Sequence, residues 1–356
     1  MSVAPVRHLQ APTLHDVRAA RERLDGIVRA SPLLRLEWEP PAPAAHAAHA
    51  SDIAGGKPAE IYLKLENLQP IGSFKLRGAT NAMLMAAQAP GAGEAAQAGR
   101  DSALAAGVYT ASAGNMAQGV AWAARRLGVA ATAIVPDHAP ATKLAAIERL
   151  GGTVVKVPFE SWWQVIAEHR YPGMPGLFIH PVSDTAVMAG NGTIGLEIVE
   201  QLPDVDLVLV PFGGGGLSCG IAAALRELRP GAAVYGCEVT TAAPLAASLA
   251  AGAPQSIDYQ PTFVDGIGGK AMLPEMWPIV SRLLAGSRVV PLAAVAAAVR
   301  LLAERHRVIA EGAGATSVAA AMALAADVPG KKIVCIVSGG NIDNAKLAAI
   351  LAGDVP

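Results

Sequence analysis

Short apolar runs rich in β-branched residues alternate along the chain with longer stretches of helical character. The predicted strands are residues 61–65, 108–110, 132–135, 154–157, 207–210, 234–239 and 333–337. The predicted helices are residues 79–85, 116–127 and 142–150. Strand–helix alternation of this kind is typical of an α/β protein whose parallel-rich sheets are covered by helices on both faces. Ligands bind such sheets beyond the carboxyl ends of the strands, so we expect the chemistry in the loops that follow them.

Two stretches of low complexity interrupt the alternation. Residues 40–57 are rich in Ala, Pro and His and are predicted to be an inserted loop. Residues 88–101 are rich in Ala and Gly and are predicted to be a second exposed connection. The spacing His46-Ala-Ala-His49 falls in the first of these, so it does not indicate a metal site.

The composition excludes disorder and several classes of partner. The 356 residues are 52% hydrophobic and 16% charged, values that also raise the question of a membrane span. The longest uncharged runs, residues 207–225 and 239–257, contain prolines and glycines that a spanning helix would not carry. A formal net charge of −1 without a basic stripe argues against nucleic acid and anionic membranes as partners. A small, nearly neutral ligand fits better.

Cysteine usage and the chain start point to the cytoplasm. Cys219, Cys237 and Cys335 are far apart and lie in apolar runs, which argues against a disulfide framework or a structural zinc. The first residues lack the apolar region of a secretory signal. We therefore expect a cytoplasmic enzyme.

A lone lysine stands between a predicted strand and a predicted helix, in the run Gly72-Ser73-Phe74-Lys75-Leu76-Arg77-Gly78-Ala79. Poor solvation among such neighbours can lower the pKa of its amine and leave it free to form a Schiff base. A surface lysine at a helix start is the alternative, and this segment alone does not decide between the two.

Four consecutive glycines form a candidate phosphate site, in the run Val210-Pro211-Phe212-Gly213-Gly214-Gly215-Gly216-Leu217-Ser218. Glycines between a strand and a helix expose backbone N–H groups, and the helix adds the positive end of its dipole. The spacing fits neither the dinucleotide fingerprint nor a P-loop. A flexible turn is the alternative.

The same loop also matches a hydrolase nucleophile elbow, in the run Gly216-Leu217-Ser218-Cys219-Gly220. That function requires a histidine later in the chain, and the single later histidine is His306. It lies in a charged helical run, so the pattern argues against a hydrolase.

Three further loops carry candidate polar groups. Ser112-Ala113-Gly114-Asn115-Met116 follows a strand and opens a helix, which suits a substrate carboxylate or an ordinary helix cap. Ser338-Gly339-Gly340-Asn341 ends the last strand and could place a hydroxyl beside a buried ring. Glu311 is a weaker candidate, because it can equally lead into a helix.

Taken together, these segments resemble the fold-type II pyridoxal-phosphate (PLP) enzymes of the threonine/serine dehydratase and serine racemase family. The resemblance runs from about Ser31 to Asp343. It rests on motifs in the family's order, namely Leu63-Lys64-Leu65-Glu66-Asn67-Leu68-Gln69, Ser73-Phe74-Lys75, Gly114-Asn115, Gly192-Thr193-Ile194-Gly195, Gly213 to Leu217 and Ser338-Gly339-Gly340-Asn341.

The resemblance implies a tryptophan synthase β-like α/β fold of two domains, each with a parallel-rich sheet flanked by helices. The large PLP-binding domain would comprise residues 1–76 and 181–356, with the insertion at 40–57. The small substrate-binding domain would comprise residues 77–180. No regulatory domain is expected after Asn341.

The same resemblance implies site roles, residue by residue. Lys75 would form the Schiff base with PLP and later remove the Cα proton, while Asn115 would bind the cofactor's 3′-oxygen and Ser338 its pyridine nitrogen. The implied cofactor-binding residues are Phe74, Lys75, Asn115, Gly213, Gly214, Gly215, Gly216, Leu217, Glu311 and Ser338. The implied substrate-binding residues are Ser112, Ala113, Gly114, Asn115 and Met116. Because a hydroxyl does not enforce ring protonation, β-elimination of a 3-hydroxy amino acid to a 2-oxo acid and ammonia is favoured.

Departures from the family pattern refine this expectation. The family commonly reads Ser-Ser-Gly-Asn-His where this chain has Ala113 and Met116. Ala113 cannot transfer a proton, so racemisation is predicted to be absent or slow. The two changes together favour an apolar or aromatic β-substituent, as in phenylserine, with threonine in a differently packed pocket as the alternative. Glu238 keeps one position of a divalent-ion site, but Pro244 stands where the second carboxylate would be, so no metal is predicted.

Other functions remain open at this point. Trp162 and Trp163 have no assigned role. An amino-acid racemase or a β-replacement synthase of the same fold is the enzymatic alternative, and a phosphate-ligand binding protein is the non-enzymatic one. The expected partner is a small amino-acid substrate, and the expected assembly is a homodimer or homotetramer.

Overall fold

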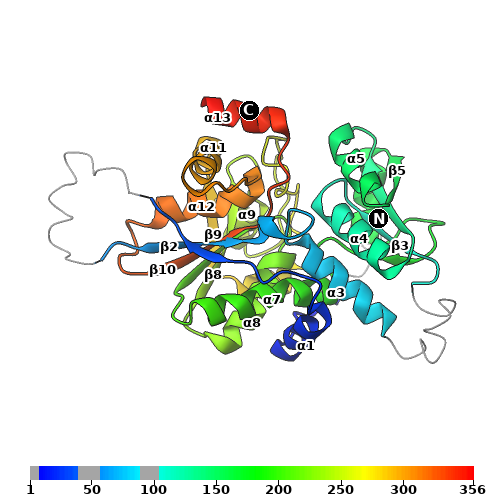
Figure 1. The fold of residues 1–356 in the computed structure, drawn as a ribbon, viewed down its shortest axis with the longest axis horizontal. Helices are drawn as coiled ribbons and strands as arrows, with labels where there is room; N and C mark the ends of the chain where they lie inside the picture. The colour runs from blue at the N-terminus through cyan, green and yellow to red at the C-terminus, as the bar shows by residue number, and fades with distance from the viewer. Residues whose placement is uncertain (1–7, 39–56, 89–103) are drawn as a thin grey trace.

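A computed structural model describes residues 8–38, 57–88 and 104–356 and shows two sheets flanked by helices (Figure 1). The six-stranded sheet has the order β1-β2-β10-β7-β8-β9, and all its neighbours are parallel except β1 and β2. Its strands are β1 (Leu33–Arg35), β2 (Glu60–Leu65), β7 (Leu207–Pro211), β8 (Ala233–Val239), β9 (Gly286–Val290) and β10 (Lys332–Val337).

The four-stranded sheet is wholly parallel, with the order β5-β4-β3-β6. Its strands are β3 (Val108–Ala111), β4 (Ala131–Pro136), β5 (Thr153–Val157) and β6 (Leu177–Phe178). Three helices surround it, α4 (Asn115–Leu127), α5 (Ala141–Arg149) and α6 (Phe159–Glu168). This smaller unit lies to the right in Figure 1.

Helices cover both faces of the larger sheet. On one side lie α11 (Leu292–Leu301), α12 (Gly312–Leu324) and α13 (Asn344–Ala352), and on the other α1 (Leu14–Leu24), α7 (Thr185–Gln201) and α8 (Gly216–Leu228) (Figure 1). The remaining helices are α3 (Lys75–Ala87), α9 (Pro244–Ala251), α10 (Trp277–Leu283), the 3₁₀ turn η1 (Glu66–Leu68) and the π-helical turn η3 (Leu302–His306).

Strand residues alternate between two apolar cores. Leu209 and Cys335 belong to the core beneath α11 and α12, whereas Val208 and Val334 belong to the core that contains α8 residues. Successive side chains of a strand point to opposite faces, so both faces of a sheet covered by helices must be apolar. This explains why the predicted strands are continuous apolar runs.

Glycines allow α7 and α8 to cross closely. A Cβ on Gly220 would lie 2.2 Å from the Met188 carbonyl oxygen, and one on Gly192 would lie 2.8 Å from the Gly220 carbonyl oxygen. Only glycine permits this approach of the two backbones. The motif Gly192-Thr193-Ile194-Gly195 therefore serves helix packing.

The α/β fold class is confirmed, and each predicted strand and helix occurs with small shifts of its ends. The helix predicted over residues 79–85 begins earlier than expected, at Lys75. The predicted loops at 40–57 and 88–101 fall almost entirely outside the described residues. The proposed domain boundaries at 76/77 and 180/181 stay a prediction, although the smaller sheet uses residues 108–178 alone. Within the described ranges, no helix has the length and apolar character needed to cross a membrane.

Candidate active site

Three neighbouring strands bring the predicted cofactor residues together at the carboxyl-terminal end of the larger sheet. β10 lies between β2 and β7, and all three run parallel. Lys75 lies in the segment after β2, Gly213 in the loop after β7 and Ser338 directly after β10. The loop after β2 is tied to the loop after β10, because the Phe74 N–H donates to the Ser338 carbonyl at 3.0 Å and Ser73 bridges to Gly339. Sheet order therefore assembles residues that are far apart in the sequence.

Lys75 is the first residue of α3, and its amine has one hydrogen-bond acceptor. Nζ donates to the Pro181 carbonyl at 2.7 Å. Burial lowers the pKa of this amine to about 8, although the charge of Glu311 opposes the shift. Such an amine is neutral in a substantial fraction of molecules near neutral pH, as Schiff-base formation requires.

A buried ion cluster fixes the helix on which Lys75 lies. Arg77 donates from Nε to Glu66 Oε2 at 2.8 Å and from Nη1 to Glu197 Oε1 at 2.6 Å. Lys64 Nζ donates to Glu197 Oε2 at 2.6 Å. Arg77, Lys64 and Glu66 are fully buried, so each carboxylate needs its cation. The cluster explains why the sequence motifs around Lys75 also contain Lys64, Glu66 and Arg77.

The glycine loop is built for close packing as well as for an anion. Gly215 has a φ of +100° and precedes the first turn of α8, whose N–H groups have no acceptor within the helix and no capping side chain. A Cβ on Gly214 would lie 2.8 Å from Val182 Cγ1, and one on Gly216 would lie 2.9 Å from the Val182 carbonyl oxygen. A Cβ on Gly213 would meet only ordinary contacts. A flexible turn is thereby ruled out, and the free N–H groups suit a phosphate.

Asn115, the first residue of α4 in the smaller unit, contacts the segments before α12 and after β10 in the larger unit. Its Nδ2 donates to Glu311 Oε1 at 2.8 Å, and its Oδ1 accepts from Asn341 Nδ2 at 2.7 Å. Burial raises the pKa of Glu311 to about 7, while the bond from Asn115 opposes the shift. Glu311 was the weakest candidate from the sequence, yet it contacts a predicted cofactor residue.

The predicted substrate loop divides into two parts. Ser112, Ala113 and Gly114 are partly exposed ahead of α4, and the Ser112 hydroxyl accepts from the Gly114 N–H at 3.1 Å. Met116 is 1% exposed and belongs to the core of the smaller unit. Its influence on a substrate can therefore act only through packing behind the loop.

The key residues of two alternative sites make ordinary structural contacts. The Ser218 hydroxyl is buried and donates to the Gly215 carbonyl at 3.2 Å, while His306 Nε2 accepts from the Glu37 N–H. No hydrolase dyad is present between them. The Glu238 carboxylate accepts from the N–H groups of Leu245 and Ala246 in the first turn of α9 and from the Ser287 hydroxyl.

The cofactor predicted from the sequence fits this donor set. The glycine loop supplies N–H groups for a phosphate, Lys75 supplies a weakly basic amine for an aldehyde, and Ser338 supplies a hydroxyl at the adjoining strand end. A residue that the sequence did not reveal is Pro181, whose carbonyl accepts from Lys75. Backbone acceptors leave no compositional signal, so this contact could not be foreseen.

Comparison with known proteins agrees with the predicted cofactor. Residues 37–339 match the family described as "Pyridoxal-phosphate dependent enzyme". The L-threonine ammonia-lyase of Thermotoga maritima is 37% identical over 334 residues, covering 93% of this chain and 76% of the relative. Threonine deaminase isoform 2 of Solanum lycopersicum superposes with a TM-score of 0.77 at 30% identity, covering 99% of both chains. The serine racemase of Dictyostelium discoideum superposes with a TM-score of 0.75 at 31% identity, covering 93% and 99%.

Proposed function

The chain belongs to the family of pyridoxal-phosphate-dependent enzymes, and from this premise we propose that it is an ammonia-lyase acting on 3-hydroxy amino acids. Its products would be a 2-oxo acid and ammonia. The single observation that carries the proposal is the weakly basic amine of Lys75 at the start of α3, which donates to Pro181, the neighbour of the Val182 that packs against the glycine loop. Relatives named threonine ammonia-lyase support the reaction class.

The proposed work of this chain begins with holding the cofactor. Gly213 to Gly216 and the start of α8 would hold the phosphate, Asn115 the 3′-oxygen and Ser338 the pyridine nitrogen. When bound, pyridoxal phosphate supplies an aldehyde that joins amines and a ring that withdraws electrons from the substrate α-carbon. Ser338 presents a hydroxyl, so the ring is not forced to carry a proton, which favours prompt loss of a β-substituent.

Lys75 is the proposed base at the α-carbon. At pH 7 an amine with a pKa of about 8 is neutral in about a tenth of molecules, ten or more times the fraction of an ordinary lysine. Ala113 lies on the loop that opens α4, where related racemases have a serine, and its methyl group carries no proton. Removal and return of protons from one face alone leads to elimination instead of inversion.

The side chain of the substrate is the finer part of the proposal. We propose a β-aryl substituent, as in phenylserine. Ala113 leaves room at the loop, and α6 brings an aromatic group to the carboxyl end of β5. Phe159 lies 5.6 Å from Trp162 between ring centroids, and Lys270 Nζ of the larger unit lies 4.5 Å from the Phe159 ring. These contacts bring aromatic rings to the boundary between the two units, with the Lys270 amine over one of them.

The decisive experiment measures 2-oxo acid and ammonia from serine, threonine and both phenylserine diastereomers. We expect release from at least one substrate, and no release by Lys75→Ala. A visible band at roughly 410–420 nm should also vanish in that variant. Lys143→Ala is the control, because Lys143 instead pairs with Asp265 at 2.9 Å. A phosphate-ligand binding protein would show neither the band nor turnover.

Two reactions of the same family are the competing outcomes. Exchange of the α-hydrogen with solvent deuterium without formation of 2-oxo acid would identify a racemase. This alternative is considered because similar solved structures are named serine racemase. Incorporation of an added thiol at the β-carbon would identify a β-replacement synthase. A homodimer or homotetramer in the cytoplasm completes the proposal, and size-exclusion chromatography with light scattering tests the assembly.

A further inference from the structure

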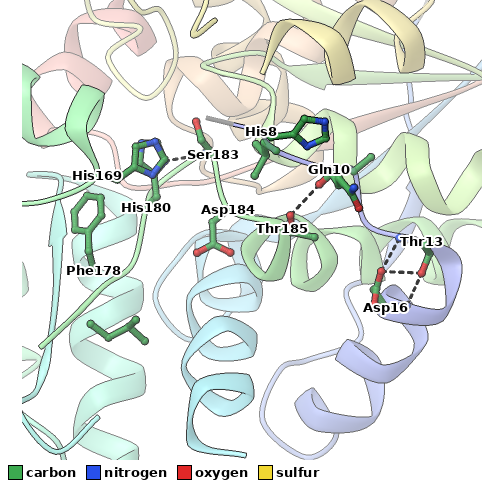
Figure 2. A pocket seen from close by; sticks show the side chains of 13 residues that line it. His8, Gln10, Thr13, Asp16, His169, Phe178, His180, Ser183, Asp184 and Thr185 are labelled. Carbon is green, nitrogen blue, oxygen red and sulfur yellow. Dashed lines mark hydrogen bonds between the residues drawn. The ribbon is translucent and has the colours of Figure 1, made fainter. Parts of the chain in front are cut away.

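A cluster of polar side chains outside the predicted site joins three separate segments. His169 follows α6 of the smaller unit, Glu275 precedes α10 of the larger one, and Ser183 lies in the connection between β6 and α7. Glu275 Oε1 accepts from Ser183 Oγ at 2.9 Å and lies 3.3 Å from His169 Nε2. The His169 ring stacks on His180 at 4.1 Å between centroids, and Figure 2 shows the two rings overlapping beside Ser183.

The segment held by this cluster contacts both parts of the proposed cofactor site. Pro181 accepts from Lys75 Nζ through its carbonyl, and Val182 packs against Gly214 and Gly216 of the glycine loop. The next residue, Ser183, is the one bound by Glu275. Any shift of residues 180–183 would therefore move the acceptor of the Lys75 amine and one wall of the glycine loop together.

A metal ion is the obvious alternative, because His169, His180 and Glu275 place ligand atoms within 4.8 Å of one another. His180 Nδ1, however, already accepts from the N–H groups of Val182 and Ser183, at 3.0 and 2.6 Å. Its Nε2 must then carry the proton and donate to the Ile166 carbonyl. Burial lowers the pKa of this ring to about 3, so it stays neutral. Neither nitrogen has a lone pair left for a metal.

We propose that His169, Glu275 and Ser183 form a latch between the two units that positions the Pro181 carbonyl against the Lys75 amine. Whenever that amine is free, the carbonyl would orient it for proton transfer at the substrate α-carbon. His169 and Glu275 would thus be positioning residues of the proposed reaction, on which this inference rests. A cavity of about 610 Å³, lined in part by His169, His180 and Ser183, opens beside the latch (Figure 2).

The test compares three variants of the full-length holoenzyme. Glu275→Ala removes the acceptor of both partners, whereas Glu275→Gln keeps an oxygen in its place. His169→Asn removes the imidazole and suits the left-handed backbone at this position, where φ is +57°. The control is Lys143→Ala, which breaks another ion pair between the two units, at 2.9 Å from Asp265, without touching residues 180–183.

Two readouts are expected to change together. Hydrogen exchange of the peptide spanning residues 179–188 should accelerate about tenfold or more in Glu275→Ala and His169→Asn. Their kcat for the best substrate should fall about 10- to 100-fold with little change in KM, since misplacement of a reacting group slows the chemical step. Glu275→Gln should restore most of the slow hydrogen exchange and most of the kcat of the wild type. Lys143→Ala should change kcat about twofold or less.

Several results would overturn the latch. Unchanged exchange at residues 179–188 in Glu275→Ala would do so even if the enzyme proved to catalyse another reaction. Faster exchange with unchanged kcat would show that the segment does not position Lys75. An equal loss of kcat in Lys143→Ala would show that any contact between the two units has the same effect as the latch. Stoichiometric zinc that is lost in His169→Asn would replace it with a metal site. A wild-type enzyme that releases no 2-oxo acid counts against the proposed function alone.

Discussion

Lys64 is the last residue but one of β2 and Lys75 is the first residue of α3, and their surroundings differ. Lys64 is fully buried and donates to Glu197, to the Ser31 carbonyl and to Gln201. Lys75 donates to one neutral carbonyl. Burial lowers both pKa values; the charge of Glu197 and its hydrogen bond oppose this shift at Lys64, whereas at Lys75 the charge of Glu311 opposes it without a hydrogen bond. A paired lysine stabilises a fold, and an underpaired one is available for chemistry.

The largest expected effect separates the two lysines by activity. Lys75→Ala should lower turnover about 10³-fold or more, because it removes the residue proposed both to attach the cofactor and to act as the base. Its free energy of unfolding should change by less than about 1 kcal/mol, since the amine has a single uncharged acceptor. Steady-state kinetics and urea unfolding measure the two quantities. Comparable turnover in Lys75→Ala would end the assignment of this residue.

The opposite outcome is expected for Lys64. Lys64→Met should lower the free energy of unfolding by about 3–5 kcal/mol, because it leaves a buried carboxylate without one of its cations. Turnover of the molecules that remain folded should stay within about threefold of wild type. Urea unfolding at constant pH provides the measurement.

A double variant controls for the cause of that loss. Lys64→Met with Glu197→Met removes both charges, although Arg77 then keeps Glu66 as its acidic partner. If the loss comes from an unpaired charge, the double variant should be more stable than the sum of the two single variants predicts. Strict additivity would show that Lys64 acts through packing alone.

The contrast between these lysines also marks what the sequence could foretell. Lys75, the glycine loop and Ser338 were predictable, because each follows a strand and parallel order brings strand ends together. Pro181 and Glu275 were not, since one acts through a carbonyl and the other through a lone side chain far along the chain. Met116 lies at a helix start, as the sequence predicted, but the direction of its side chain depends on the packing of that helix. The α7–α8 crossing likewise appears in the sequence only as scattered glycines.

Two acids extend the comparison and give a pH-dependent prediction. Arg77 and Lys64 lower the pKa of Glu197 despite its burial, whereas burial raises that of Glu311 from 4.5 to about 7. The folded cofactor-free protein then binds more protons than the unfolded chain between these values, so its stability falls as pH rises from about 4.5 to 7. The fall attributable to Glu311 should be about 2–3 kcal/mol and should be absent in Glu311→Gln. Thermal unfolding across this range, with the wild type as reference, measures it. A slope that persists in Glu311→Gln would assign the titration to another group.

The smallest expected effect concerns the second face of the substrate, where we propose that Lys75 has no counterpart. Ala113→Ser adds a hydroxyl on the loop that opens α4, at a position that is partly exposed. It should give slow racemisation, detected as D-amino acid and as α-deuterium in recovered substrate, at no more than about 1% of the elimination rate. The rate should stay low because a hydroxyl needs a neighbouring base to accept its proton. Ala113→Val, which adds bulk at the same position without a hydroxyl, is the control for a purely steric effect. Equal racemisation in the wild type would mean that another group already serves that face, and Lys75 would then no longer be the sole proton carrier.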